Sequence, residues 1–476
     1  MSTSCRPIAR LFGAAAVVVS GLACGPDSSA TRITQPAAPS LGSSTDRQRL
    51  PHAEAEAALA SVLAANDRAT ISAPSLVPPG APLAPFIEAR LYSIANLAVH
   101  DALNAIIPRF ARYADTGPLV PDANAAAAVL KAAHDAIVGA APAAQAAVDT
   151  WYAGQIAGLA GSDGLANGVA LGARVAAAIL ANRANDGVAG GGVAPYTPGT
   201  NPGDYRFTFP FNTPGFDFFG TGGFADASRW GNTVAPFVLT SASQFRAPPP
   251  YGAASNAAAV LTPLYTADFN EVKALGCMGC AARTAEQTEI ALFWMENSPT
   301  GWNRIARTVA DQRNLDAWDA ARLFAVLAVS EFDAYTASLE SKYFYNFWRP
   351  VTAVALAGTD NNPATASAAG WEVLAFPTPP VPDYPSAHST AGGAAAAVIE
   401  ALVPGRGQAI TTTSGSLPGV SRTFASVADA QDENAASRIY IGYHFRHATV
   451  EGIAQGRRVG AYVASHVLLP VTKEER

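Results

Sequence analysis

Ser-Arg-Ile-Tyr-Ile-Gly-Tyr-His, residues 437–444, is the most informative stretch of this chain. It places an arginine six residues before a histidine, in a chain that has only 7 histidines. On one regular helix, Arg438 and His444 would point about 120° apart. Gly442 lies between them and offers a bend that would aim both side chains at one point, because glycine adopts backbone angles that other residues avoid.

A second stretch with the same chemistry lies upstream. Lys342 and Arg349 are seven residues apart, which on a helix is two turns and nearly the same face. Pro350 disfavours helical geometry at Arg349 and favours the start of a new helix, so we expect the helix to end near there. The aromatic residues between the two cations favour a buried setting over a solvated surface pair.

A third stretch is Pro385-Ser386-Ala387-His388, which precedes a helix of small residues. A serine at a helix start lies beside free backbone N–H groups and the positive end of the dipole, and both favour an anion. Taken alone, the stretch is equally typical of an N-cap serine followed by a buried histidine. Together, the three stretches supply three cations, a hydroxyl and two imidazoles, which suits a tetrahedral oxyanion such as phosphate or vanadate.

These stretches resemble the three-part signature shared by vanadium-dependent haloperoxidases and type 2 phosphatidic acid phosphatases. Other stretches are similar to the bacterial haloperoxidase branch, among them 99–106, 270–276, 283–288, 302–306 and 345–353. The resemblance covers roughly residues 85–466. It implies an all-α fold with the helical-bundle core of the haloperoxidase and acid phosphatase type.

The resemblance also implies a role for each site residue. His444 would bind vanadium axially, or act as the nucleophile toward phosphate. His388 would be the acid–base group. The oxyanion would be bound by the side chains of Lys342, Arg349, Ser386 and Arg438 and by the backbone N–H of Ala387. The cofactor would be vanadate, with phosphate as a substrate or competitor in the same pocket.

The sequence departs from the family pattern at three places. Ala387 stands where the family usually has glycine. Leu339 stands in a stretch where many relatives carry Trp-Asp, and we expect it to alter the halide pocket, which leaves the halide preference open. The phosphatase pattern places an aspartate four residues after the histidine, and here that residue is Ala448. His447 and Glu451 are the candidates to replace that carboxylate, whose task is to fix the tautomer of the imidazole.

Three functions are compatible with this signature. The leading hypothesis is a vanadate-dependent haloperoxidase that oxidises a halide with hydrogen peroxide. The first alternative is an acid-phosphatase-type phosphomonoesterase that forms a phosphohistidine from a phosphate ester. The second alternative is a non-catalytic surface lipoprotein that binds phosphate.

Composition and periodicity agree with a helical globular protein. Of the 476 residues, 49% are hydrophobic and 14% are charged, which excludes a disordered chain. The net charge of −6 argues against nucleic-acid binding. Apolar residues at three-to-four spacing predict helices at 53–65, 86–107, 123–138, 143–159, 162–185, 284–296, 316–342, 389–402, 433–442 and 448–468. We therefore predict one α-helical domain at 51–470, with a long irregular segment at 186–251 and the oxyanion site within 342–444.

The two long helices at 86–107 and 316–342 carry a faint internal echo. Asp101-Ala-Leu-Asn-Ala and Asp333-Ala-Tyr-Thr-Ala occupy similar places in them. Such an echo is consistent with two related bundles. It also makes Asp101 and Asp333 candidates for partners of the arginines in the site.

The N-terminus has the features of an export signal. A short basic region precedes an apolar run at 11–23 that is too short to span a bilayer. Gly-Leu-Ala-Cys at 21–24 resembles a lipoprotein box, so we expect a signal at 1–24, with lipidation of Cys24 as the alternative to simple cleavage. Residues 25–50 are typical of a flexible tether. The protein would then be periplasmic or at the cell surface, attached to the membrane if Cys24 is lipidated.

The remaining cysteines form a Cys-Met-Gly-Cys motif. Cys277 and Cys280 would form a disulfide in an oxidising compartment. A structural metal site would need two further ligands, and none is spaced nearby.

Overall fold

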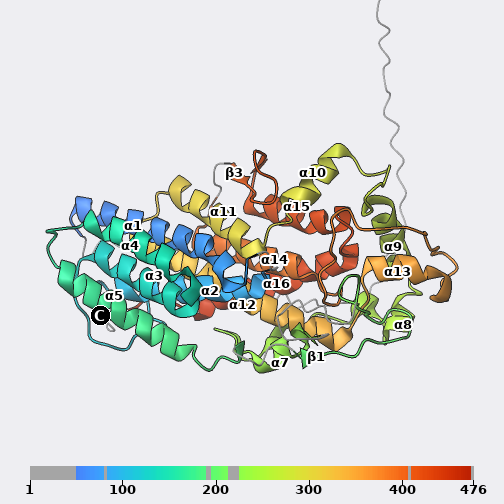
Figure 1. Cartoon of the computed structure of the whole chain (residues 1–476), viewed down its shortest axis with the longest axis horizontal. Coiled ribbons are helices and arrows are strands. Elements are labelled where there is room, and N and C mark those ends of the chain that lie inside the picture. The colour runs from blue at the N-terminus through green and yellow to red at the C-terminus, as the bar shows by residue number, and fades with distance from the viewer. Residues whose placement is uncertain (1–49, 80–82, 189–193, 213–224, 406–408, 473–476) are drawn as a thin grey trace, which may run out of the picture. The chain divides into compact units, whose positions relative to one another are not determined.

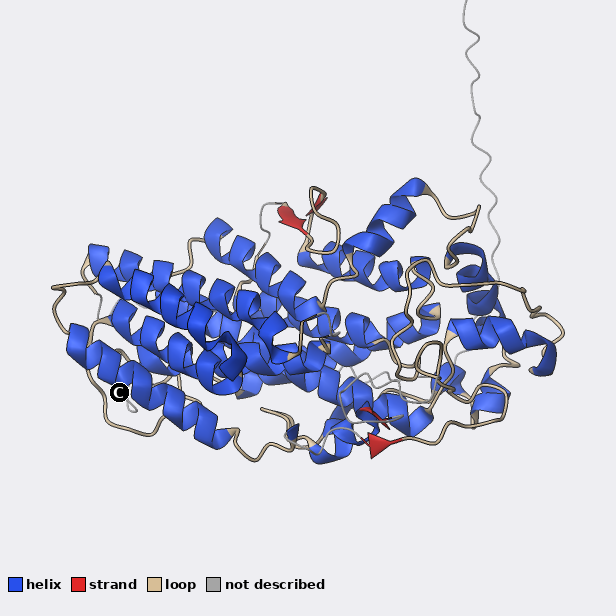
Figure 2. Cartoon of the chain, viewed as in Figure 1, coloured by secondary structure: helices blue, strands red, loops and turns tan. Residues whose placement is uncertain are grey.

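Helices make up most of the part of the chain that the computed structural model describes, residues 50–79, 83–188, 194–212, 225–405 and 409–472 (Figure 1, Figure 2). The prediction of an all-α fold is confirmed. Within those ranges the strands form two small ribbons, β1 (Ala194–Pro195) with β2 (Ala225–Asp226) and β3 (Ile410–Thr413) with β4 (Ser421–Phe424). The predicted signal, Cys24 and the tether up to residue 49 lie outside the described residues.

Five helices of the first part of the chain pack against one another, coloured blue to green in Figure 1. They are α1 (His52–Ser72), α2 (Pro85–Asn104), α3 (Ala125–Ala140), α4 (Gln145–Ala157) and α5 (Leu165–Asn182). Each corresponds to a predicted alanine-rich segment. The irregular segment at 186–251 follows, and its only α-helix in the described part is the short α7 (Trp230–Thr233).

The helices of the second part carry the three signature stretches. They are α8 (Asn256–Ala259), α9 (Pro263–Leu275), α10 (Ala285–Phe293), α11 (Ser298–Gln312), α12 (Ala317–Tyr345), α13 (Pro350–Leu356), α14 (Ala387–Leu402), α15 (Val427–Tyr440) and α16 (Arg446–His466). Helices α9 and α11 were not predicted, whereas α13 begins at Pro350, where the sequence predicts a new helix. Each has a proline in its first turn, where the missing N–H costs nothing.

Helix α12 is the central helix of the core. It begins at Asp316, whose side chain accepts from the N–H groups of Trp318 and Asp319, and it packs against both α2 and α14. Residues 320–342 are buried on every side of the helix, and they include charged side chains such as Glu331 and Asp333. Lys342 lies in its last turn, and Asn346 ends the helix in a left-handed conformation with φ of 52°. A helix that is buried over residues 320–342 therefore fixes the first cation of the site.

The aspartates that echo each other, Asp101 on α2 and Asp333 on α12, have the same structural task. Each carboxylate accepts from three consecutive backbone N–H groups of a neighbouring loop, those of 113–115 for Asp101 and those of 237–239 for Asp333. The hypothesis that they support the arginines of the site is therefore wrong, because their oxygens are committed to these loops. The repeated task agrees with two related helical bundles.

Glycines bring α14 and α16 into close contact. A Cβ atom added to Gly456 on α16 would lie 1.9 Å from the carbonyl oxygen of Thr390 on α14, and one added to Gly460 would lie 2.4 Å from that of Ala394. Both distances are far below van der Waals contact, so the two backbones touch directly. Since α14 follows His388 and α16 follows His444, this contact sets the distance between the last two signature stretches.

Gly456→Ala should therefore destabilise the protein by about 1–3 kcal/mol, the usual cost of an extra carbon in a packed core. The denaturant midpoint in urea measures the change. Gly154→Ala is the matched control, because Gly154 is an exposed residue of α4 with nothing within 4 Å of an added Cβ. That control should gain about 0.5–1 kcal/mol from helix propensity. Equal midpoints for the two variants would contradict the close contact.

Candidate active site

The three signature stretches meet at the ends of four helices. Lys342 lies at the end of α12 and Arg349 is the N-cap residue of α13, with Pro350 in its first turn. Ser386 is the N-cap residue of α14, and its hydroxyl accepts from the N–H of Ser389. Arg438 lies in the last turn of α15. Because these side chains project from helix ends, they can converge on one point although they come from different helices. Lys342 and Arg349 therefore lie on two successive helices and not on one shared face.

His444 lies in the short connection between α15 and α16. Gly442 has φ of 88°, so the chain leaves α15 in the left-handed region, as its sequence indicates. The N–H groups of Tyr443 and His444 both donate to the carbonyl oxygen of Arg438, at 3.0 and 3.2 Å. This turn holds the imidazole and the guanidinium on one side of the chain.

A cavity of about 280 Å³ brings most of the predicted site residues together. Its polar lining includes the side chains of Arg349, His388, Arg438 and His444, and Ala387 also lines it. Lys342 and Ser386 are fully buried beside it. The ammonium of Lys342 donates to the carbonyl oxygens of Pro382 and Asp383, at 2.7 and 2.9 Å, and so ties α12 to the segment before Ser386.

Asp383 is the carboxylate beside His444, and the sequence interpretation missed it. Its Oδ1 lies 2.8 Å from Nδ1 of His444, and the side chain is fully buried. His447, one of the two predicted replacements, instead accepts from the N–H of Tyr251 at 2.9 Å. The expectation that His447 or Glu451 takes this place is therefore wrong. Asp383 stands five residues before His388, so the stretch Asp-Tyr-Pro-Ser-Ala-His was the available signal.

The contacts of His444 favour one tautomer. Nη1 of Arg349 lies 3.0 Å from Nε2 of His444 and 3.5 Å from Nδ1, and Oδ1 of Asp383 lies 2.8 Å from Nδ1. Since a guanidinium only donates and a carboxylate only accepts, the shorter contacts assign the lone pair to Nε2 and the ring proton to Nδ1. Burial lowers the pKa of His444 well below its usual value, and the charges of Arg349, Lys342 and Arg438 lower it further. The result is a neutral imidazole with its Nε2 lone pair facing the cationic side of the site.

His388 has the opposite arrangement. Its Nε2 lies 3.3 Å from the carbonyl oxygen of Glu296, so Nε2 carries the proton and Nδ1 is the acceptor. Burial lowers the pKa of His388 well below its usual value, and Arg438 adds to the effect. His388 is therefore a neutral proton acceptor in the wall of the cavity.

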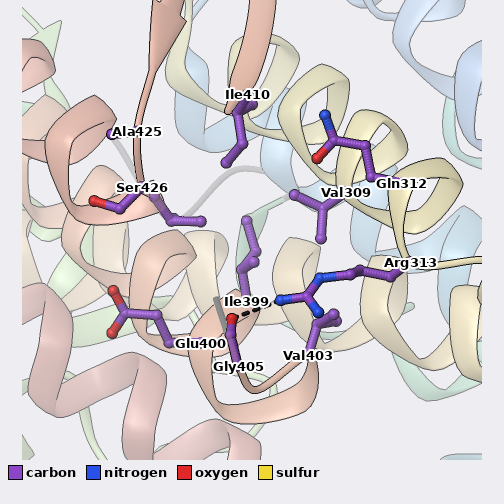
Figure 3. Close-up of a pocket in the computed structure, with 11 residues that line it drawn as sticks. Val309, Gln312, Arg313, Ile399, Glu400, Val403, Gly405, Ile410, Ala425 and Ser426 are labelled. Carbon is purple, nitrogen blue, oxygen red and sulfur yellow. Dashed lines mark hydrogen bonds between the residues drawn. The ribbon is translucent and has the colours of Figure 1, made fainter. Parts of the chain in front are cut away.

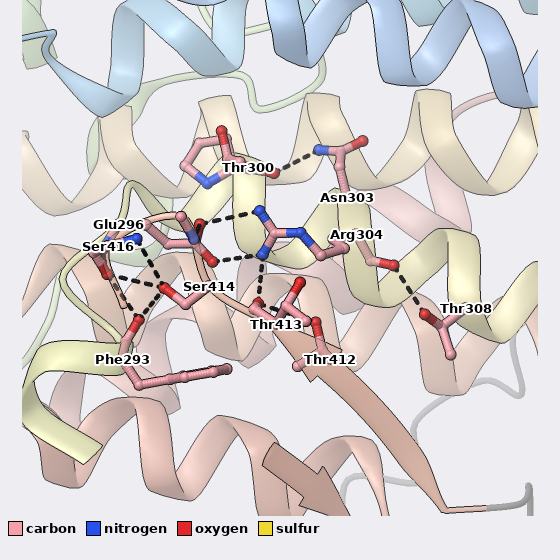
Figure 4. Close-up of polar contacts among 12 residues, drawn as sticks. Phe293, Glu296, Thr300, Asn303, Arg304, Thr308, Thr412, Thr413, Ser414 and Ser416 are labelled. Carbon is pink, nitrogen blue, oxygen red and sulfur yellow. Dashed lines mark hydrogen bonds and ion pairs between the residues drawn. The ribbon is translucent and has the colours of Figure 1, made fainter. Parts of the chain in front are cut away.

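The segment that holds His388 is itself held firmly, as Figure 4 shows. The carboxylate of Glu296 forms two contacts with Arg304, at 2.7 and 3.1 Å, and accepts from the N–H of Gly415 at 2.9 Å. The N–H of Glu296 donates to the hydroxyl of Ser416 at 3.1 Å. These contacts fix the backbone between α10 and α11. One carbonyl of this segment meets His388, and another, that of Trp294, accepts from Nη2 of Arg438.

The site holds more positive than negative charge. Burial lowers the pKa of Lys342, with Arg349 adding to the effect, and burial lowers the pKa of Arg438 to about 10. Asp383 is the acidic side chain that partly balances the charge of these cations. Burial raises its pKa to about 7, and Arg349 and Lys342 oppose the rise. An anion in the cavity would therefore be stabilised by charge as well as by hydrogen bonds.

The donor set fits an oxyanion held by one nitrogen ligand. A metal cation would need a cluster of His, Cys, Asp or Glu side chains, and the described residues contain no group of three or more that could hold one. Vanadate is different, because its oxygens require cations and N–H donors while its vanadium takes an imidazole nitrogen. The neutral imidazole of His444 beside Arg349 provides that nitrogen.

Comparisons with known proteins agree with this geometry. Residues 322–472 match the family model for the second helical-bundle domain of VCPO. The chain is 27% identical over 317 residues to the vanadium chloroperoxidase of Curvularia inaequalis. That match covers 52% of this chain and 48% of the relative, so the chain spans about half the length of the curated protein.

Solved structures share the fold across nearly the whole domain. A bacterial vanadium-dependent iodoperoxidase superposes with a TM-score of 0.70 at 23% identity, covering 87% of this chain and 98% of that one. An apo bacterial vanadium-dependent chloroperoxidase gives 0.63 at 17% identity, covering 81% and 94%. Together, these matches support the assignment of the chain to the vanadium haloperoxidase superfamily. Within this superfamily, Ala387 is tolerated in place of glycine because it lies in the first turn of α14 and is not among the residues with positive φ.

The rest of the cavity lining is largely apolar. Leu339 forms part of it, so the residue that departs from the family pattern lies next to the candidate oxyanion site. The other apolar lining residues include Leu83, Phe86, Phe211, Met295, Pro377, Pro379 and Pro380. A narrow apolar cavity excludes water and strengthens the electrostatic interactions inside it.

Two other predicted or conspicuous features lie away from the site. Cys277 and Cys280 are joined by a disulfide. A second cavity of about 440 Å³ lies beside α11, α14 and β3, where Arg313 donates to the carbonyl of Gly405 (Figure 3). None of the signature residues lines this second cavity.

Proposed function

We propose that this protein is a vanadate-dependent haloperoxidase, which oxidises a halide with hydrogen peroxide. The observation that carries the proposal is His388, a neutral proton acceptor in the same cavity wall as Arg438 and His444. Peroxide must lose protons to become a ligand and oxidant, and a neutral imidazole beside cations is suited to take them. The relatives named above, which are chloroperoxidases and an iodoperoxidase, support the same activity.

The side chains would divide the work among themselves. Nε2 of His444 would hold vanadium, and Asp383 would keep the proton on Nδ1. Lys342, Arg349 and Arg438, together with Ser386 and the N–H of Ala387, would hold the oxygens. When bound, vanadate supplies the Lewis acid that activates hydrogen peroxide. His388 would accept the proton of the incoming peroxide at Nδ1, and the apolar lining would keep bulk water out.

The test is a bromination assay with the full chain loaded with orthovanadate. We expect bromination of a phenol reporter that requires vanadate, peroxide and bromide together. His444→Ala should abolish it, because no other side chain replaces the nitrogen ligand. If bromination is absent at every pH and every vanadate concentration, the proposal is wrong. A series with chloride, bromide and iodide then gives the halide preference.

A second candidate function is a phosphomonoesterase, and the Asp383–His444 pair favours it. A carboxylate 2.8 Å from Nδ1 is the arrangement that activates an imidazole as a nucleophile toward phosphorus. His388 argues against this function. Its lowered pKa leaves the imidazole unprotonated at neutral pH, whereas the leaving oxygen of a phosphate ester needs a proton donor. Phosphate-ester hydrolysis that persists in His444→Ala would exclude the phosphohistidine route.

Binding without catalysis is the remaining outcome. If neither reaction occurs and phosphate still binds, the protein is a phosphate-binding member of the superfamily. Export and lipid attachment through Cys24 stay predictions from the N-terminal sequence. Radiolabelled fatty acid incorporation into the wild-type protein, compared with Cys24→Ala, tests the lipidation.

A further inference from the structure

Met295 lines the cavity that holds the candidate catalytic side chains. The residue before it, Trp294, accepts at its carbonyl from Arg438, and the carbonyl of the residue after it, Glu296, contacts Nε2 of His388. The backbone of Met295 is therefore held between the two side chains that we place around the oxyanion. Met295 lines the same cavity as His388 and His444, and it packs against the small apolar cluster that contains Tyr443, the neighbour of His444.

A thioether in this place is chemically exposed. Methionine sulfur is soft and readily oxidised to the sulfoxide. The described residues contain one other methionine, Met278, whose side chain is 60% exposed on the surface beside the disulfide. Met278 does not line the cavity. The described residues thus offer one thioether inside the cavity, that of Met295, and one outside it, that of Met278.

We propose that Met295 is a modification site, oxidised to the sulfoxide by the hypohalous acid formed in the cavity during turnover. This inference rests on the proposed function. The thioether sulfur gives up two electrons, the halogen leaves as halide, the oxygen forms the S–O bond, and one proton goes to solvent. One hypohalous acid is consumed for each sulfoxide, so the reaction balances without another reactant.

The consequence is a gradual change of the cavity. The sulfoxide is polar, and it would stand in an apolar wall beside Tyr443 and between the contacts of Arg438 and His388. A polar group there weakens the exclusion of water and disturbs the backbone that holds both side chains. Enzyme that has turned over many times should therefore lose activity in proportion to the sulfoxide content at residue 295.

The experiment compares the order of oxidation of the two methionines. Vanadate-loaded full chain is given peroxide, bromide and a phenol reporter, and peptide mass spectrometry follows both sulfoxides against bromination. A second sample receives hypobromite added to the solution, and a third receives peroxide without bromide. Turnover should oxidise Met295 before Met278, added hypobromite should oxidise the exposed Met278 first, and peroxide alone should oxidise neither in the same time.

Each other result has one meaning. Bromination of the reporter with Met278 oxidised first leaves the proposed function standing and overturns this inference. Equal oxidation of Met295 with and without bromide also overturns it, because the oxidant would not be a hypohalous acid. Absence of bromination rejects the proposed function, and the inference with it.

Two variants give an independent measurement. Met295→Leu is close in volume, so the core should tolerate it at a cost below about 1.5 kcal/mol. Relative to its own initial rate, it should lose activity more slowly than the wild type. Met278→Leu is the matched control and should inactivate at the wild-type rate. If Met295→Leu also inactivates at the wild-type rate, oxidation of Met295 does not limit the lifetime of the enzyme.

Discussion

Arg438→Met should lower kcat for bromination about 10²–10³-fold, the usual cost of removing one preorganised charge from a buried oxyanion site. Arg438 is 1% exposed and lines the cavity, so water does not replace it. Its loss removes one of three cations that would hold the oxygens of vanadate. The measurement is kcat at saturating vanadate, peroxide and bromide, since saturation separates the catalytic loss from weaker binding.

The matched control is Arg322→Met. Arg322 is also a fully buried arginine whose guanidinium donates to a backbone carbonyl, that of Leu468 at 2.9 Å. Burial lowers its pKa to about 10, as it does for Arg438. Arg322 does not line the cavity, so its variant should keep the wild-type kcat in the fraction that folds. Equal losses in both variants would mean that Arg438 acts only through the packing of the core.

Phosphate gives a second measurement of the same cation. A ligand that binds only the folded state stabilises it by about 2.7 kcal/mol at 100 times Kd. Wild type and Arg322→Met should show a rise in Tm with phosphate. Arg438→Met should show almost no rise in Tm at the same phosphate concentration. If its Kd is weakened about 100-fold, the site is only about half occupied and the stabilisation falls to about 0.4 kcal/mol. This result does not depend on which reaction the protein catalyses.

The sequence predicted the helices whose apolar periodicity is continuous, and it failed where a helix begins with residues that usually interrupt one. Helix α11 begins Ser-Pro-Thr-Gly, and α9 begins with Pro263 after the cap Thr262. Proline and glycine in these first turns hide the periodicity that follows. Strand pairs as short as β1–β2 leave no alternation to detect.

Site contacts between residues close in the sequence could be predicted, and contacts between distant segments could not. Arg438 and His444 are joined through one turn at Gly442, so their spacing and the glycine were sufficient. The contact between Asp383 and His444 spans two different segments of the chain, and no spacing rule connects them. The phosphatase pattern has an aspartate at the position of Ala448, so the sequence pointed to a replacement carboxylate near that residue. The fold supplies it instead from the segment before Ser386, which Lys342 anchors through two carbonyls.

Asp383→Asn should weaken vanadate binding about 10–100-fold, the usual cost of losing the partner that orients a metal-binding histidine. Oδ1 of this carboxylate lies 2.8 Å from Nδ1 of His444. An asparagine carries one acceptor oxygen and one NH₂ group, and either can face His444. If the NH₂ group faces it, the ring proton moves to Nε2 and the lone pair that should bind vanadium is lost.

The control for this substitution is Asp268→Asn. Asp268 is 4% exposed and accepts from the N–H of His447 at 2.8 Å and from the hydroxyl of Tyr251 at 3.0 Å, so it supports a histidine outside the cavity. Its variant should bind vanadate as the wild type does. Isothermal titration of the two variants measures the difference, and equal affinities would show that Asp383 does not orient His444.

The pH dependence of oxyanion binding should also depend on Asp383. Burial raises the pKa of Asp383 to about 7, so its carboxylate becomes protonated as the pH falls through that value. Protonation removes the negative charge that holds the proton of His444 on Nδ1, and binding should weaken as the pH falls. Tungstate is a suitable probe, because its charge is constant near neutral pH. The wild type should show this step and Asp383→Asn should not, whereas an identical pH profile in both would assign the step to another group.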